Sequence, residues 1–226
     1  MKGAILYVSS NREHPAFEAR VLETVLASKA LLLLPVTQAP VAQVPIGIVV
    51  GDVGVSGFNM FRQVQIGLRV LRDSGIDYVV SCEADTFYPP DYFDFVPLRL
   101  DVCYRNDNVY VMPQNRSFFW RKPEGATHAQ VVGCKFYLDT LTRLFDGAPE
   151  WAPEEKNFPK ERWGLADVFA ADQIQHWSSP SPVVQVKTSR SMRHYTHSDR
   201  IDVHELPYWG TGRAFRQKYY DIGERH

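Results

Sequence analysis

The chain has little net charge, little cysteine and no long hydrophobic run. Its 226 residues carry 25 Lys and Arg against 26 Asp and Glu, so the formal net charge is −1. A balance this even excludes a whole-molecule attraction to nucleic acid or to an anionic membrane. The three cysteines, Cys82, Cys103 and Cys134, lie far apart without a Cys-x-x-Cys pair. They argue against a disulfide framework or a zinc site and predict reduced, mostly buried thiols.

Targeting and membrane-spanning signals are also missing. The most apolar segment, 30–36, is too short to span a bilayer, and residues 1–8 lack the architecture of a signal peptide. We therefore expect a cytoplasmic protein. There is no internal repeat and no convincing linker, and 45% of the residues are hydrophobic. These features predict one globular domain over 1–226 and exclude global disorder.

Buried strands and amphipathic helices alternate along the first hundred residues. Continuous apolar runs predict strands, and apolar stripes at helical spacing predict helices. The expected strands are 3–8, 31–36, 46–50 and 78–85, with helices beginning near Pro15 and covering 58–72. This alternation is typical of an α/β sheet with helices packed on it.

The second half of the chain is less periodic. We expect strands at 107–112, 127–133 and 183–186, helices at 136–144 and 165–177, a mobile loop or lid at 147–164, and little regularity from 189 onward. Seven Lys and Arg lie between Lys187 and Lys218, against three acids. This run is either a solvated face or a patch that meets phosphate.

Two acids end the strand expected at 78–85, where acids are normally depleted. Glu83 and Asp85 are two residues apart, which on a strand places both carboxylates on one side. Two like charges held this close repel, unless a cation lies between them. A divalent metal with oxygen ligands is the favoured answer. In the alternative reading, Asp85 caps the following turn and Glu83 pairs with an arginine.

The same region resembles the central block of GT-A glycosyltransferases of the family-2-like type. That family carries an Ala-Arg-Asn-x-Gly helix followed by a strand ending in Asp-x-Asp. The matching segments here are Gly54-Val55-Ser56, Phe61-Arg62-Gln63-Val64-Gln65-Ile66-Gly67-Leu68, Asp77-Tyr78, Cys82-Glu83-Ala84-Asp85 and the opening Ser9-Ser10-Asn11-Arg12. Glu83 replaces the first Asp, and Gly51-Asp52-Val53-Gly54 stands where the family usually shows Asp-Asp-Gly-Ser.

The resemblance implies a GT-A-type, Rossmann-like fold: a mixed, mostly parallel sheet flanked by helices. It divides the domain into a nucleotide-sugar-binding half, 1–100, and an acceptor-binding half with the C-terminal tail, 101–226. The donor would be a nucleotide diphosphate sugar, with a UDP-sugar first in line. Mn²⁺ or Mg²⁺ would bridge its diphosphate, held by Asp85 directly and by Glu83 through water. The predicted donor-binding residues are Ser9, Asn11, Arg12, Asp52, Arg62, Glu83, Ala84 and Asp85.

The family also implies a downstream base and a metal-binding histidine. An inverting transfer needs a carboxylate to deprotonate the acceptor hydroxyl, and Asp172 is preferred over Asp167. Asp167 has an alternative role as a first-turn acid of the helix expected at 165–177. His194 or His197 completes the metal site in this reading. For any single histidine, a surface position is the competing interpretation.

Three functions stay open on the sequence. Besides a glycosyltransferase, a nucleotidyltransferase or a non-catalytic nucleotide-sugar or nucleic-acid binding protein fits the sheet-and-carboxylate pattern. A nucleotidyltransferase usually has a glycine-rich loop after its first strand, and residues 9–12 lack glycine. The acceptor is a glycan, a small molecule, a protein, or DNA with hydroxymethylated bases, as for similar small bacteriophage enzymes, which act in the host cytoplasm. Arg116, Arg121 and Lys122 beside Phe118, Phe119 and Trp120 are the predicted DNA contacts.

Overall fold

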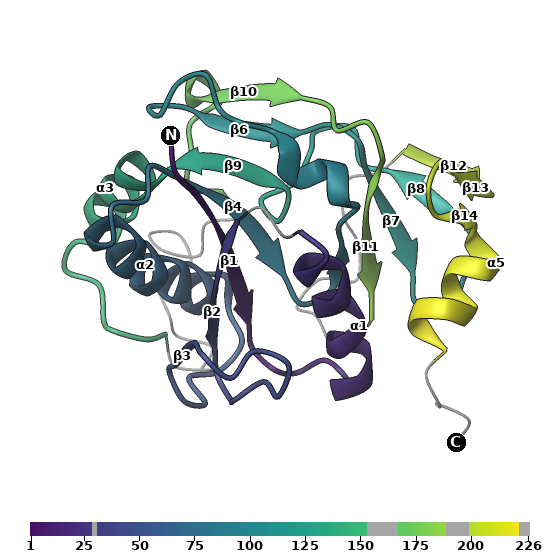
Figure 1. Ribbon diagram of the computed structural model, residues 1–226, viewed down its shortest axis with the longest axis horizontal. Helices are drawn as coiled ribbons and strands as arrows, with labels where there is room; N and C mark the ends of the chain where they lie inside the picture. The colour runs from purple at the N-terminus through teal and green to yellow at the C-terminus, as the bar shows by residue number, and fades with distance from the viewer. Residues whose placement is uncertain (29–30, 153–166, 189–198, 222–226) are drawn as a thin grey trace.

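Two β-sheets carry the fold, with helices on both faces of the larger one (Figure 1). The computed structural model describes residues 1–28, 31–152, 167–188 and 199–221. The larger sheet has the strand order β10-β6-β9-β4-β1-β2-β3. Its strands are β1 Gly3–Ser9, β2 Leu32–Thr37, β3 Ile48–Val49, β4 Tyr78–Glu83, β6 Cys103–Asn106, β9 Gln130–Gly133 and β10 Ile174–Trp177.

The smaller sheet has the order β12-β8-β7-β11-β5. Its strands are β5 Thr86–Phe87, β7 Val109–Pro113, β8 Phe119–Arg121, β11 Val183–Lys187 and β12 Asp199–Val203. A short hairpin, β13 Glu205–Leu206 and β14 Gly210–Thr211, follows. The helices are α1 Pro15–Leu26, α2 Gly57–Asp73, α3 Cys134–Leu144, α5 Gly212–Phe215, the 3-10 turns η1 Pro90–Asp94 and η2 Ala171–Gln173, and the π-helical turn η3 Arg216–Tyr220.

The larger sheet is mixed and mostly parallel. β1 runs parallel to β2 and β4, whereas β9 runs antiparallel to β4 and β6. The expected fold class, an α/β sheet flanked by helices, is therefore confirmed. Strands from both 1–100 and 101–226 share this one sheet. The division into a donor half and an acceptor half stays a prediction.

Alternate residues along the central strands serve two different cores. Leu6 and Val79 face α2 and α3, while Tyr7 and Val80 face α1 and the smaller sheet. This two-sided burial explains why β1 and β4 are apolar at nearly every position. Because the chain builds β1, β2 and β3 outward and then returns to β4, the strand order reverses between β1 and β4. In sheets of this kind, ligands bind in the crevice at the carboxyl ends beside such a reversal.

The second half of the chain departs from the sequence expectations. The predicted helix at 165–177 is wrong: its described part holds the short turn η2 and the strand β10. β10 is an edge strand with half-exposed residues, so it lacks the apolar run of a buried strand. The irregular tail is also wrong, since β12, the β13–β14 hairpin, α5 and η3 lie there. The loop expected at 147–164 falls largely outside the described residues.

In the part of the chain that the structure describes, no helix combines the length and the apolar character needed to cross a bilayer.

Candidate functional site

The acid pair lies where β4 ends and the chain turns toward β5. Asp85 is 7% exposed and already has neutral hydrogen-bond donors on both carboxylate oxygens. Thr86 Oγ1 donates to Asp85 Oδ1 at 2.9 Å, and Gln185 Nε2 donates to Asp85 Oδ2 at 2.9 Å. Asp85 therefore holds the turn against β11, as the capping alternative predicted in part. Each carboxylate oxygen keeps a further lone pair for a ligand.

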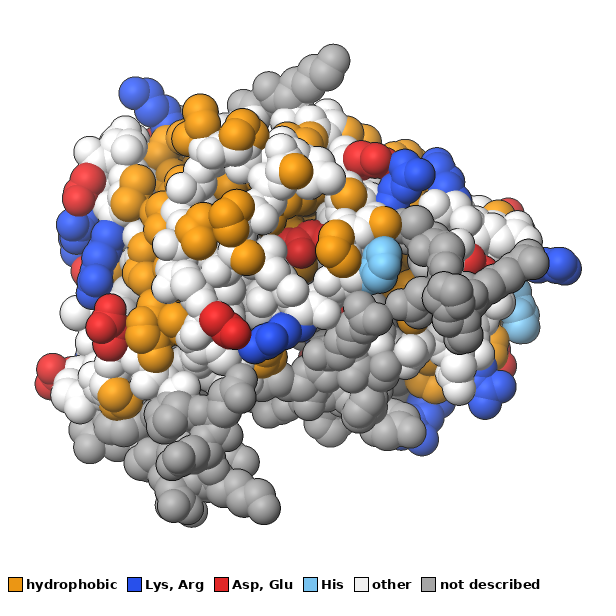
Figure 2. Space-filling model, turned by 90° about the horizontal axis from the view of Figure 1, so that it is seen from below, with side chains coloured by type: hydrophobic (Ala, Val, Ile, Leu, Met, Phe, Trp, Pro, Cys, Tyr) orange, Lys and Arg blue, Asp and Glu red, His pale blue; other side chains and the backbone are white. Residues whose placement is uncertain are grey.

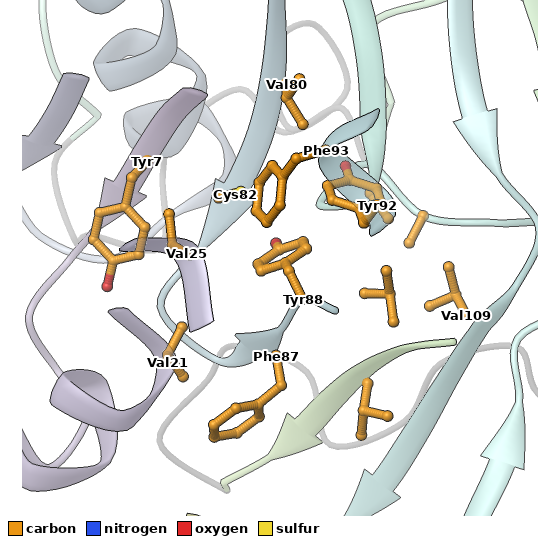
Figure 3. Packing of buried hydrophobic residues seen from close by; sticks show 14 of the residues in the cluster. Tyr7, Val21, Val25, Val80, Cys82, Phe87, Tyr88, Tyr92, Phe93 and Val109 are labelled. Carbon is orange, nitrogen blue, oxygen red and sulfur yellow. The ribbon is translucent and has the colours of Figure 1, made fainter. Parts of the chain in front are cut away.

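A tyrosine hydroxyl is inserted at the end of the β4–β9 ladder. The register pairs Val80 with Val131, so Glu83 continues opposite His128. The Glu83 N–H donates to Tyr88 Oη at 2.9 Å, and the Tyr88 hydroxyl donates to the His128 carbonyl at 2.8 Å. The hydroxyl thus replaces a direct ladder bond and fixes the backbone of the acid pair. Figure 3 shows Tyr88 beside Cys82 in the core between the two sheets.

Four charged side chains act on one another at this turn. Burial, and then the neighbouring Asp85 charge, raise the pKa of Glu83 to about 7, against the opposing pull of Lys187 and Lys122. Burial, and then the Lys187 charge, lower the pKa of Lys122 to about 8. The cations that meet the acids are therefore two lysines. The alternative pairing of Glu83 with an arginine is not what the structure shows.

A polar network lies next to Glu83 on the α3 side of the sheet. Arg105 of β6 holds Asp167 in a two-pronged ion pair, Nη1 to Oδ2 at 2.7 Å and Nη2 to Oδ1 at 3.1 Å. The Phe169 N–H also donates to Asp167 Oδ1 at 3.2 Å. Asp167 is thus a carboxylate with both oxygens engaged, and its expected place in a helix first turn is wrong. Gln130 Nε2 donates to the Tyr137 hydroxyl at 3.2 Å and completes the network.

A small cavity opens beside the acids, between the sheet and the first turns of α2. Its lining includes Val8, Met60, Ser81, Glu83 and Thr127. Within the described residues, the buried Ser81 Oγ has no hydrogen-bond partner. Figure 2 looks onto the edge where β1, β2 and β4 end, and hydrophobic side chains surround isolated charges there. A polar ligand group entering this cavity would find an unpaired hydroxyl and a carboxyl.

The predicted nucleotide contacts gather at the end of β1, across the reversal from β4. Asn11 adopts a left-handed backbone, φ 53°, and its N–H donates to Ser9 Oγ at 2.9 Å. Asn11 Oδ1 accepts from the Ala39 N–H at 2.7 Å. Arg12 Nη2 and Asp52 Oδ1 form an exposed ion pair at 2.9 Å. The structure thus brings Asp52, 40 residues beyond Arg12 in the chain, to the loop of Ser9, Asn11 and Arg12.

Arg62 is placed away from the acid pair. Its Nη1 donates to Gln65 Oε1 at 2.8 Å and its Nη2 to the Pro149 carbonyl at 2.7 Å. The guanidinium carbon also lies 4.9 Å from the Phe58 ring centroid and 5.0 Å from that of Phe145. These contacts tie α2 to the loop after α3, and burial lowers the pKa of Arg62. Its side chain is committed to packing.

Asp172 lies at the opposite edge of the sheet. It lies in η2, two residues before β10, whose first residue, Ile174, is level with Cys103, Val132 and Val79 across the sheet. From that level, Glu83 lies toward the carboxyl end of β4 and Asp172 toward the other edge. At about 3.3 Å per residue and about 4.8 Å per strand, they are roughly 20 Å apart along the strands and about 14 Å across them. The structure does not bring Asp172 together with the acid pair.

Of the remaining predicted residues, Ala84 is 8% exposed between the two acids. His194 and His197 lie outside the described residues. Within the described ranges, no group of three or more His, Cys, Asp or Glu side chains could hold a metal ion by itself. Any metal bound by the described acids therefore needs ligands from elsewhere.

Sequence reasoning missed His128, Gln185 and Tyr88. It read Lys187 as the start of a basic run and Lys122 as a DNA contact. Lys122 follows β8 and Lys187 ends β11, so both reach the acids from the smaller sheet. The β4–β5 turn that joins the two sheets has no local sequence signal. A lysine at the end of an apolar strand, 183–187, is the one available hint.

No protein-family model matches the chain, and no curated protein matches it. Solved structures do resemble it. A glycosyltransferase involved in the glycosylation of the major capsid of PBCV-1 has 9% identity and a TM-score of 0.45, covering 80% of this chain and 92% of that one. A mannose-1-phosphate geranyltransferase from Thermus thermophilus has 12% identity and a TM-score of 0.43, covering 81% of this chain and 76% of that one. A Bacillus anthracis protein described as a glucose-1-phosphate thymidylyltransferase, in complex with a sucrose, has 8% identity and a TM-score of 0.44, covering 85% of this chain and 91% of that one.

Proposed function

We propose that the chain is a glycosyltransferase of the GT-A type, which moves a sugar from a nucleotide diphosphate sugar to an acceptor hydroxyl. One observation carries the proposal: Glu83 ends β4 and Asp85 follows it in the turn, directly across the strand-order reversal from the Ser9–Arg12 loop after β1. This is the crevice where mostly parallel α/β sheets bind nucleotides. The Glu-Ala-Asp step and the helix before it resemble the donor-binding block of that family.

The carboxylate oxygens of Glu83 and Asp85 are suitable ligands for Mg²⁺ or Mn²⁺. These ions take oxygen ligands and are commonly held by one or two carboxylates, with substrate phosphates and water completing the shell. Asp85 has lone pairs left beyond its two hydrogen bonds. Glu83 has a pKa of about 7, so an incoming cation would displace its proton near neutral pH. When bound, the ion would neutralise charge developing on the leaving diphosphate. His194 and His197 stay predicted ligands.

The loop cluster after β1 would hold the nucleotide. Ser9 and Asn11 are fixed by backbone and side-chain hydrogen bonds, so their polar groups are positioned before a ligand arrives. Arg12 and Asp52 are exposed at the same edge and pair with each other. Exposed ion pairs are weak, about 0–1 kcal/mol, and therefore open readily to a ligand. We assign Asp52 and Arg12 to the base and ribose end of the donor.

Asp167 is the base that we propose for an inverting transfer. It lies on the face of the sheet that Glu83 shares, through its ion pair with Arg105. The arginine would hold the carboxylate oriented, which a general base requires. Asp172 would need a large displacement to reach the same substrate, because it borders the opposite edge of the sheet.

For the acceptor, we retain DNA with hydroxymethylated bases as a hypothesis beside a glycan or small molecule. Trp120 Nε1 donates to Asp202 at 2.9 Å, and the half-buried Phe118 and Trp120 rings are 5.7 Å apart at one end of the smaller sheet. Phe119 is fully buried, so base stacking would fall to its two neighbours. Binding to hydroxymethylated duplex should weaken steeply with salt. A flat salt response would exclude DNA as the acceptor.

Donor hydrolysis is the test of the proposal. The protein is incubated with a panel of nucleotide diphosphate sugars, with Mn²⁺ and with EDTA, and released nucleotide is measured. We expect hydrolysis that requires the metal and falls at least about a hundredfold in Asp85→Asn, since the loss of one charge-stabilising group typically has that effect. Asp94→Ala, an exposed acid on η1, is the matched control and should keep full activity. If no donor is hydrolysed, or if neither Asp85→Asn nor EDTA lowers the activity below that of wild type with Mn²⁺, the proposal is rejected.

The nucleotidyltransferase alternative has its own assay. The protein is incubated with a nucleoside triphosphate and a sugar phosphate, and released pyrophosphate is measured.

A further inference from the structure

Two lysines from different strands of the smaller sheet converge on the acid pair. Lys187 is the last residue of β11, which pairs Gln185 with Thr86 and donates the Val186 N–H to the Asp85 carbonyl at 2.8 Å. Lys187 is therefore next to the turn that carries the acids. Lys122 directly follows β8, and its N–H donates to the Val109 carbonyl at 2.8 Å. Its charge also acts on His128, six residues further along the chain.

Neither lysine ammonium group has a close hydrogen-bond or ion-pair partner within the described residues. Both lysines are partly buried, and within the described ranges no hydrogen bond or close ion pair occupies either Nζ. Burial, and then the Lys187 charge, lower the pKa of Lys122 to about 8, and the charges of Glu83 and Asp85 offset this only in part. Within the described ranges the acids lie beyond ion-pair distance of both Nζ atoms, so holding two partly buried, mutually repelling cations there is unfavourable. Such an arrangement is expected where an anionic ligand supplies the missing contacts.

A buried imidazole lies within the same group of charges. His128 is 2% exposed, and burial together with the charges of Lys122, Lys187 and Arg105 holds its pKa well below the usual value. Its Nε2 is buried and has no hydrogen-bond partner among the described residues. Arg105 is committed to Asp167 through two hydrogen bonds. The two lysines and the unpaired histidine nitrogen therefore remain for a ligand.

We propose that Lys122 and Lys187 form an anion site that binds the two phosphates of a nucleoside diphosphate, with His128 lining it. That the ligand carries a nucleoside rests on the proposed function. That it carries two phosphates rests on the two lysines. Lysine binds phosphate as a flexible point charge with three donors. Two such groups beside a carboxylate pair suit a ligand with two adjacent anionic centres. On binding, the lysines would shift from the acids to the phosphates.

This anion site differs from a metal-bridged site because it does not require a divalent cation to bind a diphosphate. A diphosphate held by the acid pair needs a divalent cation between like charges, whereas one held by the lysines binds with the metal removed. The two modes are compatible, because an anion that engages the lysines frees Glu83 and Asp85 from their countercharges. Metal-free binding is therefore the property that isolates the lysines.

The experiment is isothermal titration of pyrophosphate and of UDP in EDTA at pH 7, with wild type, Lys122→Met and Lys187→Met. We expect wild type to bind both ligands, and each substitution to weaken binding by about tenfold or more, the effect of losing about 1.4 kcal/mol. Lys135→Met is the matched control and should bind as wild type, since Lys135 is exposed on α3 and pairs with Asp139. Lys122→Arg and Lys187→Arg keep the charge and should retain most of the affinity.

Removing a lysine also leaves the acids with less countercharge, so folding is checked by circular dichroism. Lys122→Met combined with Glu83→Gln also removes the acid that loses its countercharge, and so tests the same ligand contact without an uncompensated Glu83. Pyrophosphate affinity equal to wild type in folded lysine variants, or no metal-free binding by wild type, overturns the inference. If the lysines prove necessary for pyrophosphate but no donor is ever hydrolysed, the anion site stands and the proposed function fails. If donors are hydrolysed but the lysines are dispensable for anion binding, the proposed function stands and the anion site fails.

Discussion

Replacing Glu83 with glutamine should stabilise the protein at neutral and alkaline pH. Burial and the Asp85 charge raise the pKa of Glu83 from its usual 4.5 to about 7. Between these values the folded state holds a proton that the unfolded state has lost, so the free energy of unfolding falls as pH rises through this window. At about 1.4 kcal/mol per pH unit, the ionised carboxylate costs about 3 kcal/mol above pH 7. Glutamine keeps the shape of the protonated acid and avoids that cost.

The measurement is urea denaturation of wild type and Glu83→Gln at pH 4.5, 6 and 8. The two proteins should be about equally stable at pH 4.5 and should differ by about 3 kcal/mol at pH 8, or by roughly 6–12 °C in Tm. Glu124→Gln, at an exposed position, is the matched control and should follow the wild-type profile. A constant difference between wild type and Glu83→Gln across this range would refute the reasoning. So would a destabilised variant at pH 8, because it would show that the lysines stabilise the ionised acid fully.

Two further substitutions test the supporting contacts. Tyr88→Phe removes the hydroxyl between the Glu83 N–H and the His128 carbonyl. The free energy of unfolding, measured in urea, should fall by about 2 kcal/mol. An unchanged urea midpoint would mean that water replaces the hydroxyl. Asp167→Asn breaks the pair with the buried Arg105 and should cost about 3 kcal/mol. If Asp167 is also the base, transfer to an acceptor should fall further than the folded fraction does, while metal-dependent donor hydrolysis should fall less.

The first half of the fold follows from its sequence because its strands are buried on both faces. Every position of β1 and β4 that lies inside the sheet faces a core, so the apolar runs are continuous and their ends are sharp. The helix α2 was equally clear from its apolar stripe, and Ser56 caps it by accepting the Asn59 N–H at 2.9 Å. The acid pair was found for the same reason, as polar residues that end an apolar run.

The second half could not be read in the same way. β10 and β12 are edge strands with mostly half-exposed or exposed residues, so neither alternation nor an apolar run marks them. The apolar residues in the described part of the helix expected at 165–177 serve different tertiary contacts. Phe169, for example, stacks on Phe136 at 5.5 Å between ring centroids. Such contacts depend on tertiary placement and have no local period.

The candidate site shows the same limit. Its acids and the loop after β1 are local features of a strand end, and the sequence placed them at one edge of the sheet. Its cations are not: Lys187 is opposite the acid turn only because β11 pairs with β5, about a hundred residues earlier in the chain. The charge balance of the site therefore cannot be predicted from the sequence, because it depends on how the two sheets pack together. The acids alone predict a metal, because nothing in the sequence places Lys122 and Lys187 beside them.

The central claim is that Asp85 and Glu83 hold a divalent cation against a nucleoside diphosphate. The most direct measurement is the electron paramagnetic resonance signal of free Mn²⁺, titrated with wild type and with Asp85→Asn in the presence of a fixed UDP concentration. We predict that wild type removes Mn²⁺ from solution well beyond what UDP alone binds, and that Asp85→Asn adds little to the UDP baseline. Equal Mn²⁺ uptake by the two proteins would contradict the claim.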